Sequence, residues 1–198
     1  MKLIFKGKFD GNPDSIPSNE HRENAVKYKE FDNPDKLALV ANLLSCVIAA
    51  ITILSFVFRC NISKETILPV ASKLFIASVL SMLSLFPHEL LHAVCFKDKV
   101  YLYTYWKKMM LFVTGPEDMT KGRFIFMSLL PNLIFGFIPY IIAMYNPSFV
   151  ILGFFGALSI SAGIGDYINV FNTLTQVPKG ALVYLHGFNS YWYLPKKK

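Results

Sequence analysis

The chain has 198 residues, of which 54% are hydrophobic, 15% aromatic and only 17% charged. Soluble domains carry about a quarter charged residues, so this composition excludes an ordinary soluble domain and indicates a membrane protein. The formal net charge is +7, but no basic stripe is interleaved with aromatic residues, so nucleic acid is not expected as a partner. The three cysteines show no paired spacing and indicate small buried side chains, not a disulfide framework.

Residues 1–36 are polar and show no signal-peptide pattern, so an internal apolar segment is expected to direct membrane insertion. This segment is predicted to be a cytoplasmic N-terminal arm. It contains one short strand at "LIFKGKF", followed by an irregular stretch rich in turn-forming residues.

Four apolar stretches predict four transmembrane helices. The first has 22 uncharged residues, enough to cross a hydrocarbon core of roughly 30 Å at 1.5 Å per residue. Three residues join the last two stretches, so these should form a tight antiparallel helical hairpin. The four spans are placed at 37–58, 74–96, 124–145 and 149–174, within a membrane domain of residues 37–174.

Aromatic and β-branched residues fill the segment between the second and third spans. The runs "KVYLYTYWKK" and "MMLFVTGPED" predict a β-hairpin over 99–114 at the membrane interface. Similar chemistry recurs in the cytoplasmic tail, residues 175–198. The predicted fold class is therefore an all-α membrane protein with four transmembrane helices, a small interfacial β-hairpin and short cytoplasmic termini.

The distribution of basic residues sets the expected orientation, because Lys and Arg are retained on the cytoplasmic side. The segments 1–36, 97–123 and 175–198 hold seven, six and four of the 20 Lys and Arg residues, and four spans place these segments on one side. Both termini are therefore expected in the cytoplasm, with the lipid bilayer as a partner of the chain.

"HELLH", residues 88–92, lies inside the second apolar stretch and fits the H-E-x-x-H pattern. His88 and His92 project from one helix face about 40° apart, so both imidazoles can bind one Zn²⁺. Glu89 lies about 100° further round, where it can take a proton from the attacking water as general base. The alternative is three polar residues on an exposed helix, but ionisable residues inside a span cost roughly 2.5–3.5 kcal/mol each and favour a metal site.

Asp166 is the other carboxylate within a predicted span and is the candidate third metal ligand. In the expected topology, His88 and Asp166 differ in depth by only ~5 Å. Gly163 and Gly165 leave room for close helix approach beside it. The alternative is a buried carboxylate satisfied by Ser161, Asn169 or backbone groups.

Asn132 follows a proline inside the third span and is a candidate catalytic residue that holds a substrate strand or polarises its carbonyl. An interhelical hydrogen bond at a proline kink explains it equally well. Pro87 is expected to loosen the second span just before His88. His186 and His21 are interpreted as ordinary histidines outside the metal site.

These elements resemble an uncharacterised bacterial family of zincin (HExxH) membrane peptidases, which is distantly similar to the site-2 proteases. The resemblance rests on "HELLHA", a Pro-Asn span, "GD" with Asn169 three residues later, and the tail "VPKGALVYLHGFNSYWYLP". It implies a bacterial cell-membrane location, a zinc cofactor, and roles for His88, Glu89, His92 and Asp166 as in site-2 proteases. Those enzymes often carry Asp within N-P-D-G, whereas this chain has Gly165-Asp166-Tyr167.

The leading hypothesis is a multi-pass zinc metallopeptidase that cleaves a membrane-anchored or interfacial protein substrate. The main alternative is a non-enzymatic membrane protein that binds metal for a sensor, structural or transport role. A transporter is expected to show inverted repeats, and none is evident. A second enzymatic alternative is a zinc hydrolase acting on a lipid or another amide.

Overall fold

The computed structural model describes residues 1–31, 34–61, 67–108 and 110–196. They form two compact units, and each unit has its own hydrophobic core. Unit 1 comprises Met1–Glu30, Glu89–Leu129 and Ile168–Lys198, and unit 2 comprises Phe31–His88 and Leu130–Tyr167. The predicted connection between the first two spans lies partly outside the described residues, as does the end of the tail.

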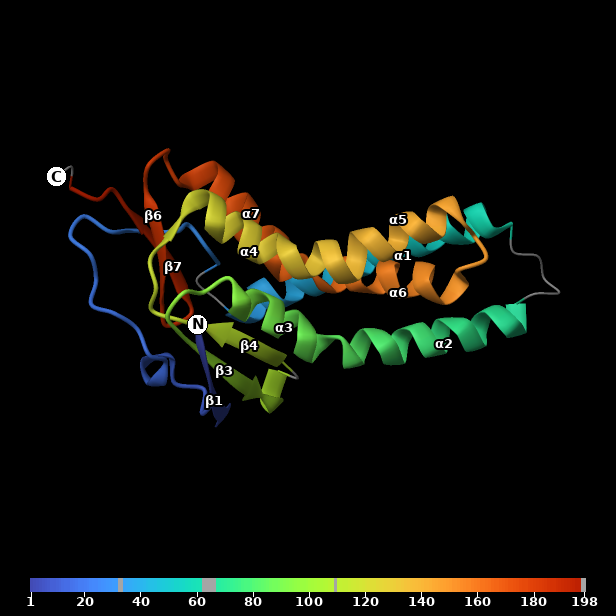
Figure 1. The fold of residues 1–198 in the computed structure, drawn as a ribbon, viewed down its shortest axis with the longest axis horizontal. Coiled ribbons are helices and arrows are strands. Elements are labelled where there is room, and N and C mark those ends of the chain that lie inside the picture. Colours follow the sequence, from blue (N-terminus) through green and yellow to red (C-terminus); the bar gives the residue numbers. More distant parts are fainter. Residues whose placement is uncertain (32–33, 62–66, 109, 197–198) are drawn as a thin grey trace. The chain divides into compact units, whose positions relative to one another are not determined.

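Unit 2 is helical, and helix α6 packs against α1, α2 and α5 (Figure 1). Its core forms around Phe56 of α1, which is fully buried and meets Phe154 of α6 edge to face. A Cβ atom at Gly153 would lie 2.1 Å from the Phe56 ring, so only glycine allows this approach. The elements are α1 (Pro34–Cys60), α2 (Ile67–Leu83), the π-helix η4 (Asn132–Phe137), α5 (Ile138–Tyr145) and α6 (Val150–Ala162).

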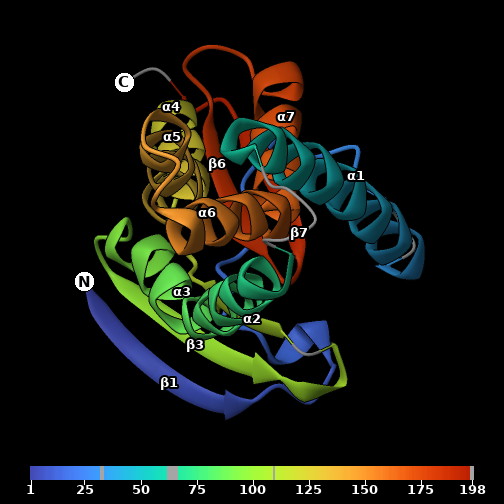
Figure 2. The ribbon, with the colours of Figure 1, turned by 90° about the vertical axis from the view of Figure 1, so that its right-hand side faces the viewer.

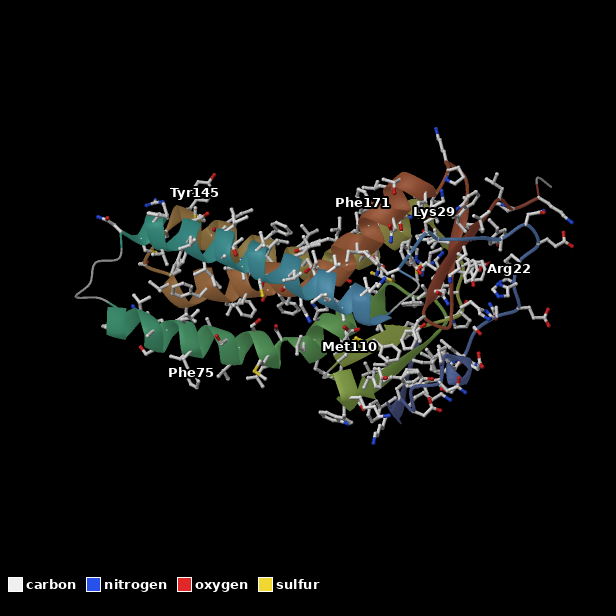
Figure 3. The ribbon with its side chains drawn as sticks, turned by 180° about the vertical axis from the view of Figure 1, so that it is seen from behind. Arg22, Lys29, Phe75, Met110, Tyr145 and Phe171 are labelled. Carbon is white, nitrogen blue, oxygen red and sulfur yellow. The ribbon has the colours of Figure 1, made fainter. Side chains whose placement is uncertain are left out.

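Three helices among the described residues are long and apolar enough to cross a membrane: Lys36–Cys60, Pro69–Val94 and Lys121–Tyr145. A fourth span results if the pair Val150–Ala162 and Ile164–Gln176, bent by 51°, counts as one. Large apolar side chains on these helices point away from the protein, as Figure 3 shows for Phe75 and Tyr145, which are 70% and 84% exposed. Contact between so much apolar surface and water costs free energy, and the hydrocarbon core of a bilayer would remove that contact.

Unit 1 contains two small sheets. The first has the strand order β1-β3-β4, with β1 (Lys2–Lys8) at one edge, as Figure 2 shows. Strand β3 (Lys99–Tyr105) pairs in parallel with β1 and antiparallel with β4 (Met110–Thr114). Strand β4 is therefore the other edge of this sheet.

The second sheet has the order β2-β7-β6-β5. Its centre is the hairpin of β6 (Leu182–His186) and β7 (Asn189–Tyr193), formed by the tail. The short strands β2 (Val26–Lys27) and β5 (Met119–Thr120) add to its two sides. Helices α3 (Leu85–Val94), α4 (Lys121–Pro131) and α7 (Ile164–Gln176) contribute residues to both units.

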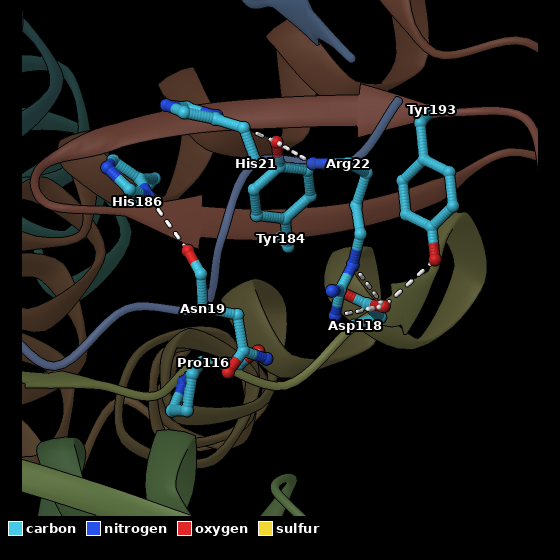
Figure 4. A network of polar contacts seen from close by, with 8 residues as sticks. All are labelled: Asn19, His21, Arg22, Pro116, Asp118, Tyr184, His186 and Tyr193. Atoms are coloured by element: carbon cyan, nitrogen blue, oxygen red, sulfur yellow. Dashed lines mark hydrogen bonds and ion pairs between the residues drawn. The ribbon is translucent and has the colours of Figure 1, made fainter. Parts of the chain in front are cut away.

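Polar contacts attach the irregular part of the N-terminal arm to the second sheet (Figure 4). The Arg22 guanidinium donates two hydrogen bonds to Oδ2 of Asp118, at 3.2 and 3.0 Å, and the Tyr193 hydroxyl donates to the same oxygen at 2.9 Å. The Asn19 side-chain amide donates to the Pro116 carbonyl at 2.7 Å. Side-chain hydrogen bonds thus hold this irregular part of the arm in place within unit 1.

Three apolar helices and the 99–114 hairpin agree with the sequence prediction, and the fourth predicted span is a pair of helices bent by 51°. The β-structure is more extensive than predicted. The hairpin pairs Tyr101 with Thr114. The described residues are mostly helical with small sheets, so the predicted fold class holds in part. The strand expected at "LIFKGKF" is β1, whereas the second sheet, built around the tail, was not predicted. Single strands such as β1 take their pairing from distant segments, and local sequence patterns do not reveal those partners.

Candidate metal centre

The H-E-x-x-H motif lies on helix α3 (Leu85–Val94). His88, Glu89 and His92 each offer a ligand atom, and these atoms lie within 4.8 Å of one another. The preceding helix α2 ends at Leu83. Pro87, four residues later, has no N–H that could donate to the Leu83 carbonyl. The backbone nevertheless continues in helical form, because His88 N–H donates to the Ser84 carbonyl at 2.8 Å.

His92 is buried, with 8% of its surface exposed. Its Nδ1 lies 2.9 Å from the backbone carbonyl oxygen of Met127 in α4. A carbonyl oxygen only accepts hydrogen bonds, so Nδ1 carries the proton and the lone pair of the neutral ring is on Nε2. This is the arrangement in which a histidine binds a metal through Nε2 while a backbone group fixes its orientation.

The Glu89 carboxylate contacts the edge of the first sheet. Its Oε2 accepts a hydrogen bond from the backbone N–H of Val113 in β4 at 3.0 Å. Along an antiparallel strand, the N–H groups of successive residues point alternately towards and away from the neighbouring strand. The N–H of Val113 points away from β3 and towards Glu89. The interaction fixes the side chain of the candidate base at the free edge of the strand.

Within unit 2, His88 and Asp166 lie side by side. Nε2 of His88 is 3.3 Å from Oδ2 of Asp166, and both side chains are more than four-fifths buried. The same carboxylate oxygen accepts a hydrogen bond from the Asn132 amide at 2.7 Å. The Tyr167 hydroxyl donates to Oδ1 of Asn132 at 3.4 Å. Asn132 is itself only 1% exposed, so it holds the carboxylate from inside the helical unit.

Gly163 creates the space that Asn132 occupies. A Cβ atom at position 163 would lie 1.7 Å from Oδ1 of Asn132, far inside contact distance. Gly165 has no heavy atom within 4 Å of the corresponding position. Of the two glycines that the sequence placed beside Asp166, only Gly163 is therefore required by packing.

A family model described as "Putative zincin peptidase" matches residues 81–182, more than half of the chain. The chain belongs to this family. No curated protein and no solved structure matches the chain. The matched region begins before the motif helix and ends after Asp166, so it covers both groups of candidate ligands.

Membership of the zincin peptidase family implies zinc, and the donor set agrees with it. Two imidazoles and one carboxylate are a usual set for catalytic zinc, in which a fourth position stays open for water. The hydrogen bond from Nδ1 leaves Nε2 of His92 as its metal-binding atom. Nε2 of His88 lies 3.3 Å from a carboxylate oxygen of Asp166, so these two side chains are close enough to bind the same ion.

An ion pair lies at the C-terminal end of the motif helix. The Arg123 guanidinium donates to the Cys95 carbonyl through Nε at 2.9 Å and to Oε1 of Glu117 at 2.5 Å. Oε2 of Glu117 accepts from the N–H groups of Lys97 and Asp98. Burial raises the pKa of Glu117, but Arg123 and the two N–H groups together hold it below the ordinary value of 4.5.

The two remaining histidines, His21 and His186, take part in the polar contacts between the N-terminal arm and the second sheet. His21 and His186 stack at 4.0 Å between ring centroids. Nδ1 of His21 is 3.1 Å from the Tyr184 hydroxyl, and Nδ1 of His186 is 3.1 Å from the Asn19 carbonyl oxygen (Figure 4). Each ring therefore has a local polar contact within unit 1.

Sequence reasoning missed the groups that orient the candidate ligands. The Met127 carbonyl and the Val113 N–H are backbone atoms, and no residue type identifies them. Tyr167 directly follows Asp166. Its hydroxyl group, placed in an apolar span, was the available sign in the sequence that this tyrosine has a hydrogen-bond partner.

Proposed function

We propose that this protein is an integral membrane zinc metallopeptidase, similar to site-2 proteases, that hydrolyses peptide bonds of a membrane-associated protein. The observation that carries the proposal is the pairing of His88 with Asp166 at 3.3 Å, with His92 one turn further along the same helix. His88, His92 and Asp166 are the proposed ligands. Bound zinc would lower the pKa of a water molecule towards ~7 and polarise the substrate carbonyl.

Glu89 is the proposed general base. Its carboxylate accepts a proton from the attacking water and passes that proton to the departing amine. The Val113 N–H at 3.0 Å keeps the Glu89 carboxylate in place between these two transfers. Asn132 holds Oδ2 of Asp166 at 2.7 Å, which supports a role in orienting the third ligand; contact with a substrate carbonyl stays a prediction.

An apolar groove in unit 2 supports a membrane-associated substrate. It has a volume of about 740 Å³ and runs between α2 and the start of α6. Its lining includes Leu83, Ser84 and Pro87, and Pro87 directly precedes His88. An apolar segment within the bilayer could lie along this groove and present a peptide bond near the motif helix.

The proposed location is the bacterial cell membrane with both termini in the cytoplasm. The support is the charge distribution, together with three helices, or four with the bent pair, of suitable length and apolarity. Reporter fusions at each terminus test this orientation. A reporter fusion that shows either terminus on the extracytoplasmic side of the membrane would contradict it.

The cellular experiment compares wild type with Glu89→Gln, which keeps the side-chain shape but removes the base. A membrane protein that is cleaved in wild-type cells should accumulate uncleaved in cells carrying the variant. Identical membrane proteomes in the two strains would contradict peptidase activity and favour the non-enzymatic metal-binding alternative.

A further inference from the structure

Pro131 occupies an interior position of the long helical segment Lys121–Tyr145. In an α-helix, the N–H of each residue donates to the carbonyl four residues earlier. Proline has no N–H, so residue 131 provides no donor for the carbonyl of Met127. Met127 is only 7% exposed, and a buried carbonyl without a partner costs free energy.

His92 supplies the missing donor. Its Nδ1 lies 2.9 Å from the Met127 oxygen, where a regular helix would offer that oxygen the N–H of residue 131. The carbonyl is thus satisfied by a side chain from α3. In return it fixes the protonated nitrogen of His92 and leaves Nε2 as the acceptor.

We infer that Pro131 is a positioning residue for the metal centre, because its missing N–H reserves the Met127 carbonyl for His92. Any other amino acid at position 131 would supply a helical N–H that draws this carbonyl back towards the helix axis. His92 would then share the carbonyl or lose it, and its ring would become free to rotate or to change tautomer. Such outer contacts set metal affinity, and their loss typically weakens it by about 10–100-fold.

The next residue in the chain gives the segment a second positioning contact. Asn132, at the start of the π-helix, holds Oδ2 of Asp166 within unit 2. π-Helical turns occur frequently at functional sites. Two neighbouring residues thus orient two proposed ligands. Pro131 leaves the Met127 carbonyl to His92 because it lacks an N–H, and Asn132 donates its side-chain amide to Asp166.

The inference rests on the proposed zinc site, and its test measures zinc affinity of the full chain in detergent by chelator competition. Pro131→Ala restores the N–H and should weaken zinc binding by about 10-fold or more. Lactic acid at position 131, introduced by nonsense suppression, opens the ring but supplies an ester oxygen in place of N–H. This ester variant should bind zinc as tightly as wild type.

Pro139→Ala is the matched control, because Pro139 is the next proline along the same segment Lys121–Tyr145, eight residues beyond the position that leaves the Met127 carbonyl to His92. Equal zinc affinity of wild type and Pro131→Ala would overturn the inference. Equal weakening in the alanine and ester variants would also overturn it, because the ring and not the missing N–H would then matter. Absence of zinc from the wild-type protein would overturn the proposed function itself, and this inference with it.

Thermal unfolding separates positioning from a general structural defect. Alanine has a far higher helix propensity than proline, so Pro131→Ala should unfold at or above the wild-type temperature while its zinc affinity falls. A parallel loss of stability and zinc affinity, with the ester variant equally affected, would assign Pro131 a purely structural role.

Discussion

His88 and Asp166 meet at 3.3 Å between Nε2 and Oδ2, although His88 lies in α3 and Asp166 lies in the first turn of α7, far along the chain. The carboxylate oxygen that faces the imidazole also accepts the Asn132 amide at 2.7 Å. Asp166 is therefore held on one side by a fixed donor and presents its charge to a histidine on the other. Both residues of this pair belong to unit 2.

Gly163→Ala should disturb this pair through Asn132. The added methyl carbon would lie 1.7 Å from Oδ1 of Asn132, so the amide must move and release Asp166. We expect a loss of stability of about 1–3 kcal/mol from overpacking and weaker zinc binding, measured by thermal unfolding and chelator competition.

Gly165→Ala is the control for this prediction, because the space around position 165 is open. It should preserve zinc affinity and be neutral or slightly stabilising in a helix. Equal effects of the two alanine variants would contradict the role assigned to the Gly163 contact.

The candidate ligands could be predicted from the sequence because their residue types are costly in an apolar segment. His88 and His92 follow a fixed helical spacing, and Asp166 interrupts an otherwise uncharged stretch. The partners of these residues could not be predicted in the same way. The contact between His92 and Met127 depends on a backbone oxygen whose availability only the packing of α3 and α4 reveals.

The sheets show a second limit of sequence reasoning. The 99–114 hairpin is local and was predicted, whereas β1 pairs with the distant strand β3, with Lys2 opposite Lys99. The tail hairpin similarly takes β2 and β5 as its neighbours. Non-local pairing of short strands depends on the assembled core and not on the pattern of any one strand.

Acidification should weaken the attachment of the motif helix through Glu117. Because the folded state lowers the pKa of Glu117 below 4.5, its ion pair stabilises the fold above that pH and is lost as the pH falls through the lowered value. Glu117→Gln should therefore reduce stability by about 1–2 kcal/mol at pH 7. Thermal unfolding in detergent should show this difference shrinking as the pH falls below 4.5, and an unchanged difference would argue against the ion pair.

Filling the apolar groove should impair access of a membrane-associated substrate. Leu83 lines the groove and is 68% exposed, so Leu83→Trp adds bulk there without replacing a core side chain. Cells with this variant should accumulate the same uncleaved protein as Glu89→Gln, while the purified variant keeps its zinc.

Leu39→Trp provides a comparison on α1, at a residue that is 61% exposed and does not line the groove. It should leave substrate cleavage unchanged. If both tryptophan variants cleave the substrate like wild type, the groove has no part in substrate access.

The most direct measurement of the central claim is the zinc content of the purified chain and three variants. Wild type and Glu89→Gln should each hold one zinc per chain, because the base is not a ligand, whereas His92→Ala and Asp166→Ala should lose most of theirs. Loss of zinc from Glu89→Gln would contradict its role as base. Full retention by Asp166→Ala would remove it as the third ligand, and a wild-type chain without zinc would contradict the account as a whole.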